Sequence, residues 1–213
     1  VIARVGAPTP EHLAYAAALR ASLPEGLSEA VRDPLASSAV LYGILLSGRD
    51  AVRQDQMHAI GQTAGMEVEK NTAELVPVLA QMKPESRLPV ADLAVASLKS
   101  LSPEQYAVFK QTVDHLVAAD KEVDLFEYTL QRMIGRRLGP VFEGTKPPAV
   151  HYYDLKPLLP ACAKLLSCLA YWGADDLPAA QLAFGYGVEK LQRGTLPMEA
   201  LQNCGLPALD ASL

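Results

Sequence analysis

Residues 112–130 contain the boundary between two predicted helices and read Thr112-Val-Asp-His-Leu-Val-Ala-Ala-Asp-Lys-Glu-Val-Asp-Leu-Phe-Glu-Tyr-Thr-Leu130. Apolar residues recur at helical spacing on both sides, whereas four carboxylates fall within the eight residues from 120 to 127. A polar turn between two such stretches indicates that one amphipathic helix ends there and the next begins. This junction therefore predicts a helical hairpin.

Capping signals mark the starts of both helices. Ser102 with Gln105, and Asp124 with Glu127, have the spacing of a capping box, in which two side chains satisfy the first backbone N–H groups. Pro103 also suits the first helical position. The residues predicted to form the two apolar stripes are Tyr106, Phe109, Val113, Leu116 and Val117 in the first helix, and Leu130, Met133, Ile134 and Leu138 in the second.

Helical spacing continues through nearly the whole chain, and no segment shows the sustained alternation of a strand. Further start signals lie at Thr9-Pro10, at Asp33-Pro34, at Leu88-Pro89 and at Asp176-Leu177-Pro178. We therefore expect an all-α fold of stacked helical hairpins that form an irregular bundle.

A Pro-rich segment, residues 140–151, is the best candidate for a linker. The length allows a single helical domain, 1–213, or two subdomains, 1–139 and 152–213, joined by this loop. The chain opens without methionine in a Pro-rich stretch and ends within a helical pattern. We therefore expect a piece of a longer protein.

Composition limits the classes of partner. Half of the residues are apolar, and the formal net charge is −5. The densest basic group, Arg132 with Arg136 and Arg137, lies where a helix C-terminus favours cations, so we expect no nucleic-acid partner. The longest apolar stretch, 158–174, is interrupted by Lys164 and does not read as a membrane span. The chain itself is expected to be soluble.

No motif of a known catalytic chemistry is present. The histidines show no HExxH spacing, and there is no phosphate-binding loop or nucleophile elbow. The three cysteines form no metal or disulfide framework and are expected to be buried thiols. Gly185 and Gly187 lie inside a helical pattern, where small residues allow another helix to approach. We therefore predict that the chain is not an enzyme.

The acidic turn has two interpretations. Its four carboxylates are Asp120, Glu122, Asp124 and Glu127. Carboxylate oxygens suit a hard cation such as Ca²⁺ or Mg²⁺, with weak affinity expected. Leu125 and Gln131 occupy the positions where an EF-hand needs glycine and glutamate, so the turn is not an EF-hand. The alternative is that Asp124 and Glu127 cap a helix while the other two carboxylates are solvated.

Four aromatic residues are candidates for partner binding: Tyr152, Tyr153, Tyr171 and Trp172. The first pair follows the prolines, and the second pair closes a predicted helix. Exposed tyrosine and tryptophan anchor many protein interfaces. The alternative is that they seal the ends of the helical bundle.

Several stretches together resemble a known family. They are residues 5–14, 30–34, 101–106, 124–133 and 148–153, and they look like the region downstream of the protease domain in bacterial HtpX-like membrane zinc metallopeptidases. In that family the zinc ligands and the transmembrane helices lie upstream, so no catalytic or zinc-binding residue carries over. The resemblance implies a non-catalytic interaction or regulatory domain at the cytoplasmic face of the inner membrane. Its partner would be the protease domain of the parent protein, which holds the zinc, or another protein.

The unit from Leu116 to Met133 is also similar to the TerB-like helical fold. That resemblance implies an alternative function, a divalent-cation-binding module that uses the acidic turn at 120–127. The sequence departs from the pattern because no glycine follows Asp120.

Overall fold

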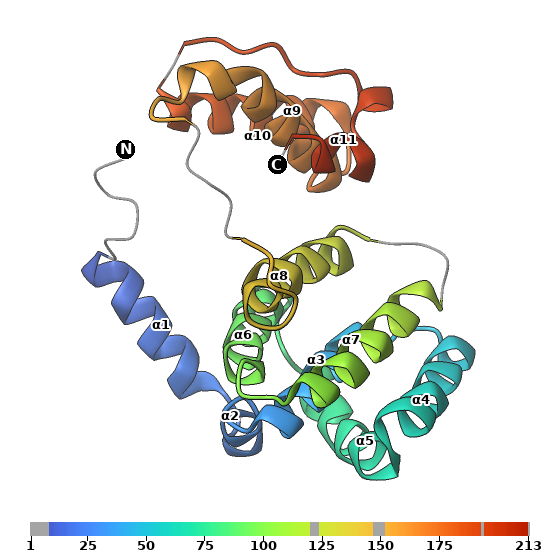
Figure 1. The fold of residues 1–213 in the computed structure, drawn as a ribbon. Coiled ribbons are helices and arrows are strands. Elements are labelled where there is room, and N and C mark those ends of the chain that lie inside the picture. Colours follow the sequence, from blue (N-terminus) through green and yellow to red (C-terminus); the bar gives the residue numbers. More distant parts are fainter. Residues whose placement is uncertain (1–8, 120–123, 147–151, 193, 213) are drawn as a thin grey trace. The chain divides into compact units, whose positions relative to one another are not determined.

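The computed structural model describes residues 9–119, 124–146, 152–192 and 194–212. Every regular element in these ranges is helical (Figure 1), so the all-α prediction is confirmed. Among these residues no helix has the length and apolar character that a membrane span requires. The chain divides into two compact units, unit 1 (residues 1–147) and unit 2 (residues 148–213), and each is described by itself.

The described part of unit 1 contains α1 (Pro10–Ser22), α2 (Glu25–Ala30), α3 (Pro34–Leu45), α4 (Asp50–Ala64), α5 (Met66–Ala80), α6 (Pro84–Leu98), α7 (Pro103–Ala118) and α8 (Leu125–Phe142) (Figure 1). Helix α3 packs against α5, α6 and α7 and so lies at the centre of the unit. It is apolar around most of its circumference, as a helix enclosed by neighbours must be, and residues 37–42 are all buried.

The core of unit 1 includes the stripe predicted for α7, since Tyr106, Phe109, Val113, Leu116 and Val117 are all buried. The ring of Phe109 stacks on Tyr42 of α3 with 5.7 Å between the ring centroids. Burial raises the pKa of Tyr42 to about 12, although a side-chain hydrogen bond with Thr112 acts in the opposite direction. The large side chains at the α3–α7 contact are thus enclosed.

One buried polar side chain, Gln56 of α4, joins three elements. Its Oε1 accepts a hydrogen bond from the N–H of Ser47 at 2.8 Å, and its Nε2 donates to the carbonyl of Leu116 at 2.9 Å and to that of Leu45 at 3.4 Å. The side chain is 1% exposed. All of its hydrogen-bonding partners are backbone groups near helix C-termini, where the helix itself leaves hydrogen-bonding capacity unused.

The end of α8 corrects the predicted linker. The helix continues through Pro140 to Phe142, so the loop does not begin at residue 140. The ring of Phe142 stacks on Tyr106 with 4.2 Å between centroids, and the Tyr106 hydroxyl donates to Glu143 Oε1 at 2.7 Å. Burial and this hydrogen bond raise the pKa of Tyr106. Tertiary contacts therefore hold the last turn of α8 despite the proline.

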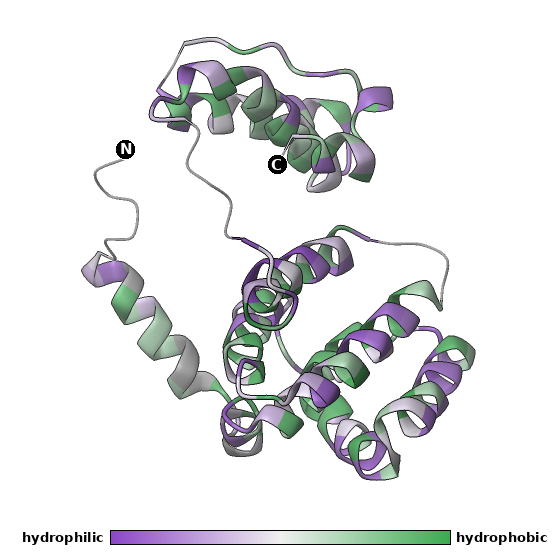
Figure 2. Cartoon of the chain, in the orientation of Figure 1, coloured by the Kyte–Doolittle hydropathy of each residue, from purple (hydrophilic) through white to green (hydrophobic). Residues whose placement is uncertain are grey.

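The described part of unit 2 contains the 3-10 turns η2 (Lys156–Leu158) and η3 (Leu201–Asn203), and the helices α9 (Leu159–Trp172), α10 (Leu177–Leu191) and α11 (Leu206–Asp210). Helices α9 and α10 pack together as a hairpin, with hydrophobic stretches along both (Figure 2). A Cβ at Gly187 would lie 2.7 Å from Leu166 Cδ2, which confirms the predicted close approach there. At Gly185 nothing lies within 4 Å of such a Cβ, so that part of the prediction is wrong.

An extended segment returns along α9. The N–H of Glu199 donates to Ser167 Oγ at 2.9 Å, and the hydroxyl of Tyr171 donates to the Glu199 carbonyl at 3.0 Å. Cys168 and Cys204 are buried here, and burial, together with a hydrogen bond between the two thiols, raises the pKa of Cys204 to about 11. The segment is thus fixed to α9 by side chains of that helix.

Candidate functional site

The acidic turn begins α8 with the predicted capping box. The N–H of Glu127 donates to Asp124 Oδ1 at 2.7 Å, and the N–H of Asp124 donates to Glu127 Oε2 at 3.2 Å. Glu127 is buried. The capping interpretation is therefore confirmed for these two residues, whereas Asp120 and Glu122 lie outside the described residues.

The cation hypothesis stays a prediction. Within the described ranges, no group of three or more His, Cys, Asp or Glu side chains is placed to hold a metal ion. Because half of the predicted ligand set lies outside those ranges, this observation does not bear on the complete turn. Both carboxylates that the structure does describe already accept backbone hydrogen bonds.

The aromatic candidates occupy different environments within unit 2. Tyr152 and Tyr153 are 55% and 82% exposed, and Trp172 is 38% exposed. Tyr171 is half-buried, and its hydroxyl is engaged by Glu199 as described above. This position supports the sealing role for Tyr171, and partner binding by the exposed aromatic residues stays a prediction.

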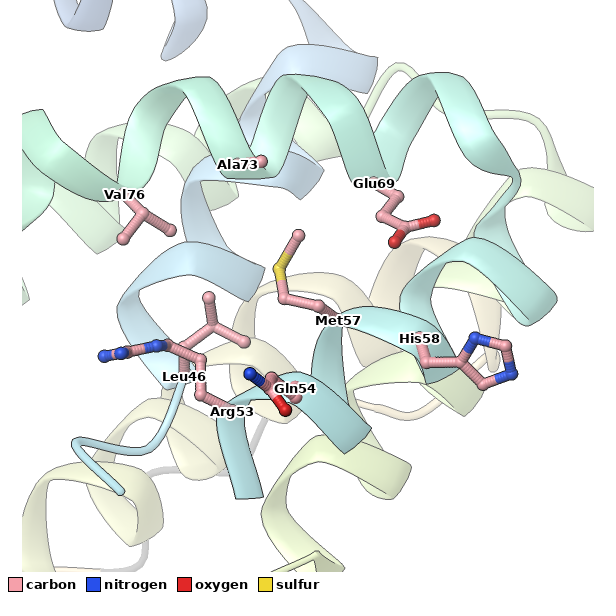
Figure 3. A pocket seen from close by; sticks show the side chains of 8 residues that line it. All are labelled: Leu46, Arg53, Gln54, Met57, His58, Glu69, Ala73 and Val76. Atoms are coloured by element: carbon pink, nitrogen blue, oxygen red, sulfur yellow. The ribbon is translucent and has the colours of Figure 1, made fainter. Parts of the chain in front are cut away.

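A surface groove that sequence analysis did not find lies between α4 and α5 (Figure 3). We call it the α4–α5 groove; its volume is about 390 Å³. The residues that line it are Leu46, Arg53, Gln54, Met57, His58, Glu69, Ala73 and Val76. The Met57 side chain points into the space between the two helices, with Val76 toward one end and Glu69 toward the other (Figure 3).

The groove exists because a one-residue turn joins the two helices. Gly65 has φ 98°, a left-handed conformation that glycine adopts without steric cost. The resulting hairpin directs Ile60 and Thr72 into the core, where both are fully buried. Met57 and Val76 fall beside those inward positions, so they remain half-buried and line the opening between the helices.

Charged side chains flank the apolar floor. At one end Arg53 is paired with Asp50, one helical turn earlier. At the other end lies Glu69, which is half-buried. A Cβ added at Gly61 would collide with the Glu69 carboxylate, so this carboxylate lies directly over the glycine of α4. The groove is thus apolar in its middle and charged at its rim.

Another hollow, about 500 Å³, lies between α2 and α5. Two of its carboxylates are already engaged, because Asp33 accepts a hydrogen bond from the N–H of Ala36 at 2.8 Å and Glu74 pairs with Lys70. The α4–α5 groove differs in presenting a half-buried carboxylate beside apolar side chains.

The helical spacing of apolar residues did not predict the groove, because it identifies only the face of each helix that packs into the core. In α4, the spacing of apolar residues alone admits either Gln56 or Met57 as an inward residue. The structure buries Gln56 and leaves Met57 at the edge of the groove. The available signal in the sequence was a pair of apolar residues, Met57 and Val76, outside the fully buried positions Ile60 and Thr72 of the two helices.

Comparison of the chain with protein-family models, with curated proteins and with solved structures finds no match.

Proposed function

We propose that this chain is a non-catalytic interaction and regulatory domain that receives an apolar segment of another protein in the α4–α5 groove. The observation that carries the proposal is the composition of that groove, with Met57 in the middle, Val76 and Arg53 toward one end and Glu69 toward the other. Specific protein interfaces commonly combine an apolar centre with a polar rim. A methionine in the centre also adapts its shape to different partners.

The family resemblance supports a more specific setting for the same domain. We place it in a membrane-bound zinc metallopeptidase of the HtpX-like kind, at the cytoplasmic face of the inner membrane. In that setting the zinc site belongs to the upstream protease domain, and the partner is that domain or a protein it acts with. The support is the set of stretches quoted above, which includes both capping boxes.

Selection of peptides tests the proposal directly. A displayed library of random 12-residue peptides is enriched on the purified chain, with Met57→Asp as the counter-target, because a carboxylate in the groove opposes apolar burial. Enriched peptides are expected to bind the wild-type chain and to lose binding to Met57→Asp. Val108→Asp is the matched control, since Val108 is exposed on α7, outside the residues that line the groove.

Two results would contradict the proposal. One is that no enriched peptide distinguishes the wild-type chain from Met57→Asp while the circular dichroism of both is the same. The other is peptidase activity of the purified chain that persists through repeated purification, which would overturn the non-catalytic assignment.

A further inference from the structure

Glu69 contributes a negative charge to the groove, toward the end where His58 also lies (Figure 3). Among the described residues, no hydrogen bond or ion pair is made by its side chain, although the residue is half-buried. The adjacent cation, Lys70, is directed to Glu74, with 3.8 Å between Lys70 Nζ and Glu74 Oε1. At the opposite end of the groove Arg53 is paired with Asp50. A positively charged group of a bound segment, placed near Glu69, would therefore complement the charge of the groove.

Helix geometry alone does not account for the position of this carboxylate. Acidic residues in the first turn are favoured by the helix dipole, and both Glu67 and Glu69 meet that condition in α5. Glu67, however, is exposed, whereas Glu69 lies across Gly61 of the neighbouring helix and lines the groove. Glu67 therefore provides a matched control for the charge of Glu69.

We infer that the segment bound in the α4–α5 groove carries a lysine or arginine next to its apolar anchor residues, and that this cation pairs with Glu69. The inference rests on the proposed function and deepens it by defining the chemistry of the partner. The apolar side chains of the segment cover Met57 and Val76, while its cation reaches the Glu69 carboxylate at the other end of the groove (Figure 3). Burial of such helical or extended segments in grooves is a recurrent mode of peptide recognition.

The probe is a set of three synthetic pools of 12-residue peptides. Each pool carries two leucines four residues apart, and the pools differ only in the residue three positions after the second leucine, which is Lys, Gln or Glu. Binding to the complete chain is measured by fluorescence anisotropy. The Lys pool is expected to bind about fivefold more tightly than the Gln pool, which is the size of a partly exposed ion pair, and the Glu pool most weakly.

Variants of the protein assign the preference to one side chain. Glu69→Gln keeps the shape of the residue and is expected to abolish the difference between the Lys and Gln pools. Glu67→Gln makes the same charge change in the same helical turn and is expected to preserve the difference. If all pools bind equally to the wild-type chain, or if the Lys preference survives in Glu69→Gln, the inference is overturned. If, in either case, the peptides bind the wild-type chain but not Met57→Asp, the proposed function still holds. If no pool binds the wild-type chain, both the proposed function and this inference are overturned.

Gly61→Ala gives a second, independent test. The added methyl group displaces the carboxylate end of the flexible Glu69 side chain, but the residue remains a negatively charged glutamate. Because alanine is favoured over glycine within a helix, this variant is expected to fold at least as well as the wild type. A reduced Lys preference in a stable Gly61→Ala protein supports the inference, and an unchanged preference in that protein contradicts it.

Discussion

Unit 1 and unit 2 are both helical, but they cover their apolar side chains to different extents. The core of unit 1 extends from α2 to α8 and contains Tyr42 and Phe109 at its centre. A buried cluster of unit 2 consists of Ala170, Ala180 and Phe184. On α10, Leu182 and Tyr186 are each 61% exposed.

This difference follows from size. A short helical hairpin has too little volume to enclose apolar residues on more than one side, whereas a stack of several helices does. The stability of unit 2 therefore depends on few residues and on the hydrogen bonds that fix its extended segment to Ser167 and Tyr171. Helical periodicity alone does not reveal which of the two situations applies.

The largest effect is expected in the core of unit 1. Phe109→Ala and Leu116→Ala each remove a side chain that is at most 1% exposed, and each is expected to lower the free energy of unfolding by about 2–5 kcal/mol. Val108→Ala on the same helix removes a 37% exposed side chain and should change stability by about 0.5 kcal/mol or less. Urea denaturation followed by circular dichroism measures these values. Core variants that match the wild type would refute the assignment of this helix face.

The next largest effect is expected in unit 2 and tests whether the two units unfold separately. Phe184→Ala is expected to destabilise unit 2 by about 3 kcal/mol because, among the described residues of that unit, no other aromatic ring is buried. Trp172 is the only tryptophan of the chain and lies in unit 2, so its fluorescence reports on that unit. The fluorescence transition should move to lower urea while the main dichroism transition stays in place. Leu182→Ala is the matched control on α10, and an equal shift of both signals by Phe184→Ala would refute separate cores.

A smaller effect is expected from the buried polar contact of unit 1. Gln56→Leu preserves much of the side-chain volume but leaves the N–H of Ser47 without its partner and removes the donor to the Leu116 carbonyl, which retains only the N–H of Ala119 at 3.4 Å. The expected cost is about 1–3 kcal/mol, the range for an unsatisfied buried group. Gln62→Leu, at an exposed position of the same helix, is the control. If the two variants are equally stable, Gln56 does not connect the helices in solution.

The fold was predictable where strong local signals coincide. Ser102 with Gln105 and Asp124 with Glu127 form the capping boxes that their spacing indicates, and the stripe that includes Phe109 is buried as expected. These features depend on residues within one or two helical turns, so the sequence contains all the information they need.

The errors arise where distant contacts override a local rule. Helix α6 begins at Pro84 rather than at Leu88-Pro89 and continues through Pro89, although that proline forgoes one hydrogen bond of the helix; its buried residues, Val90 and Ala91 among them, hold it in the core of unit 1. The α4–α5 groove was missed for a related reason. Whether Met57 or Gln56 faces the core depends on how α4 is rotated against α5 and α7, which no spacing within α4 defines.

The smallest effect addresses the acidic turn of unit 1. Asp124→Ala removes the side chain that accepts the Glu127 N–H and is expected to cost about 0.5–2 kcal/mol, measured in the unit 1 transition. Asp124→Asn keeps a good N-cap and should cost only about 0.3–1 kcal/mol through the weaker interaction with the helix dipole. Calorimetric titration of the same proteins with calcium and magnesium then separates the two interpretations of the turn. If the Asp124 carboxylate serves only as a cap, titration of the wild-type protein with either metal gives no heat of binding. If the carboxylate also ligates a cation, the wild-type protein gives heat of binding, and this heat disappears in Asp124→Asn although the helix remains capped.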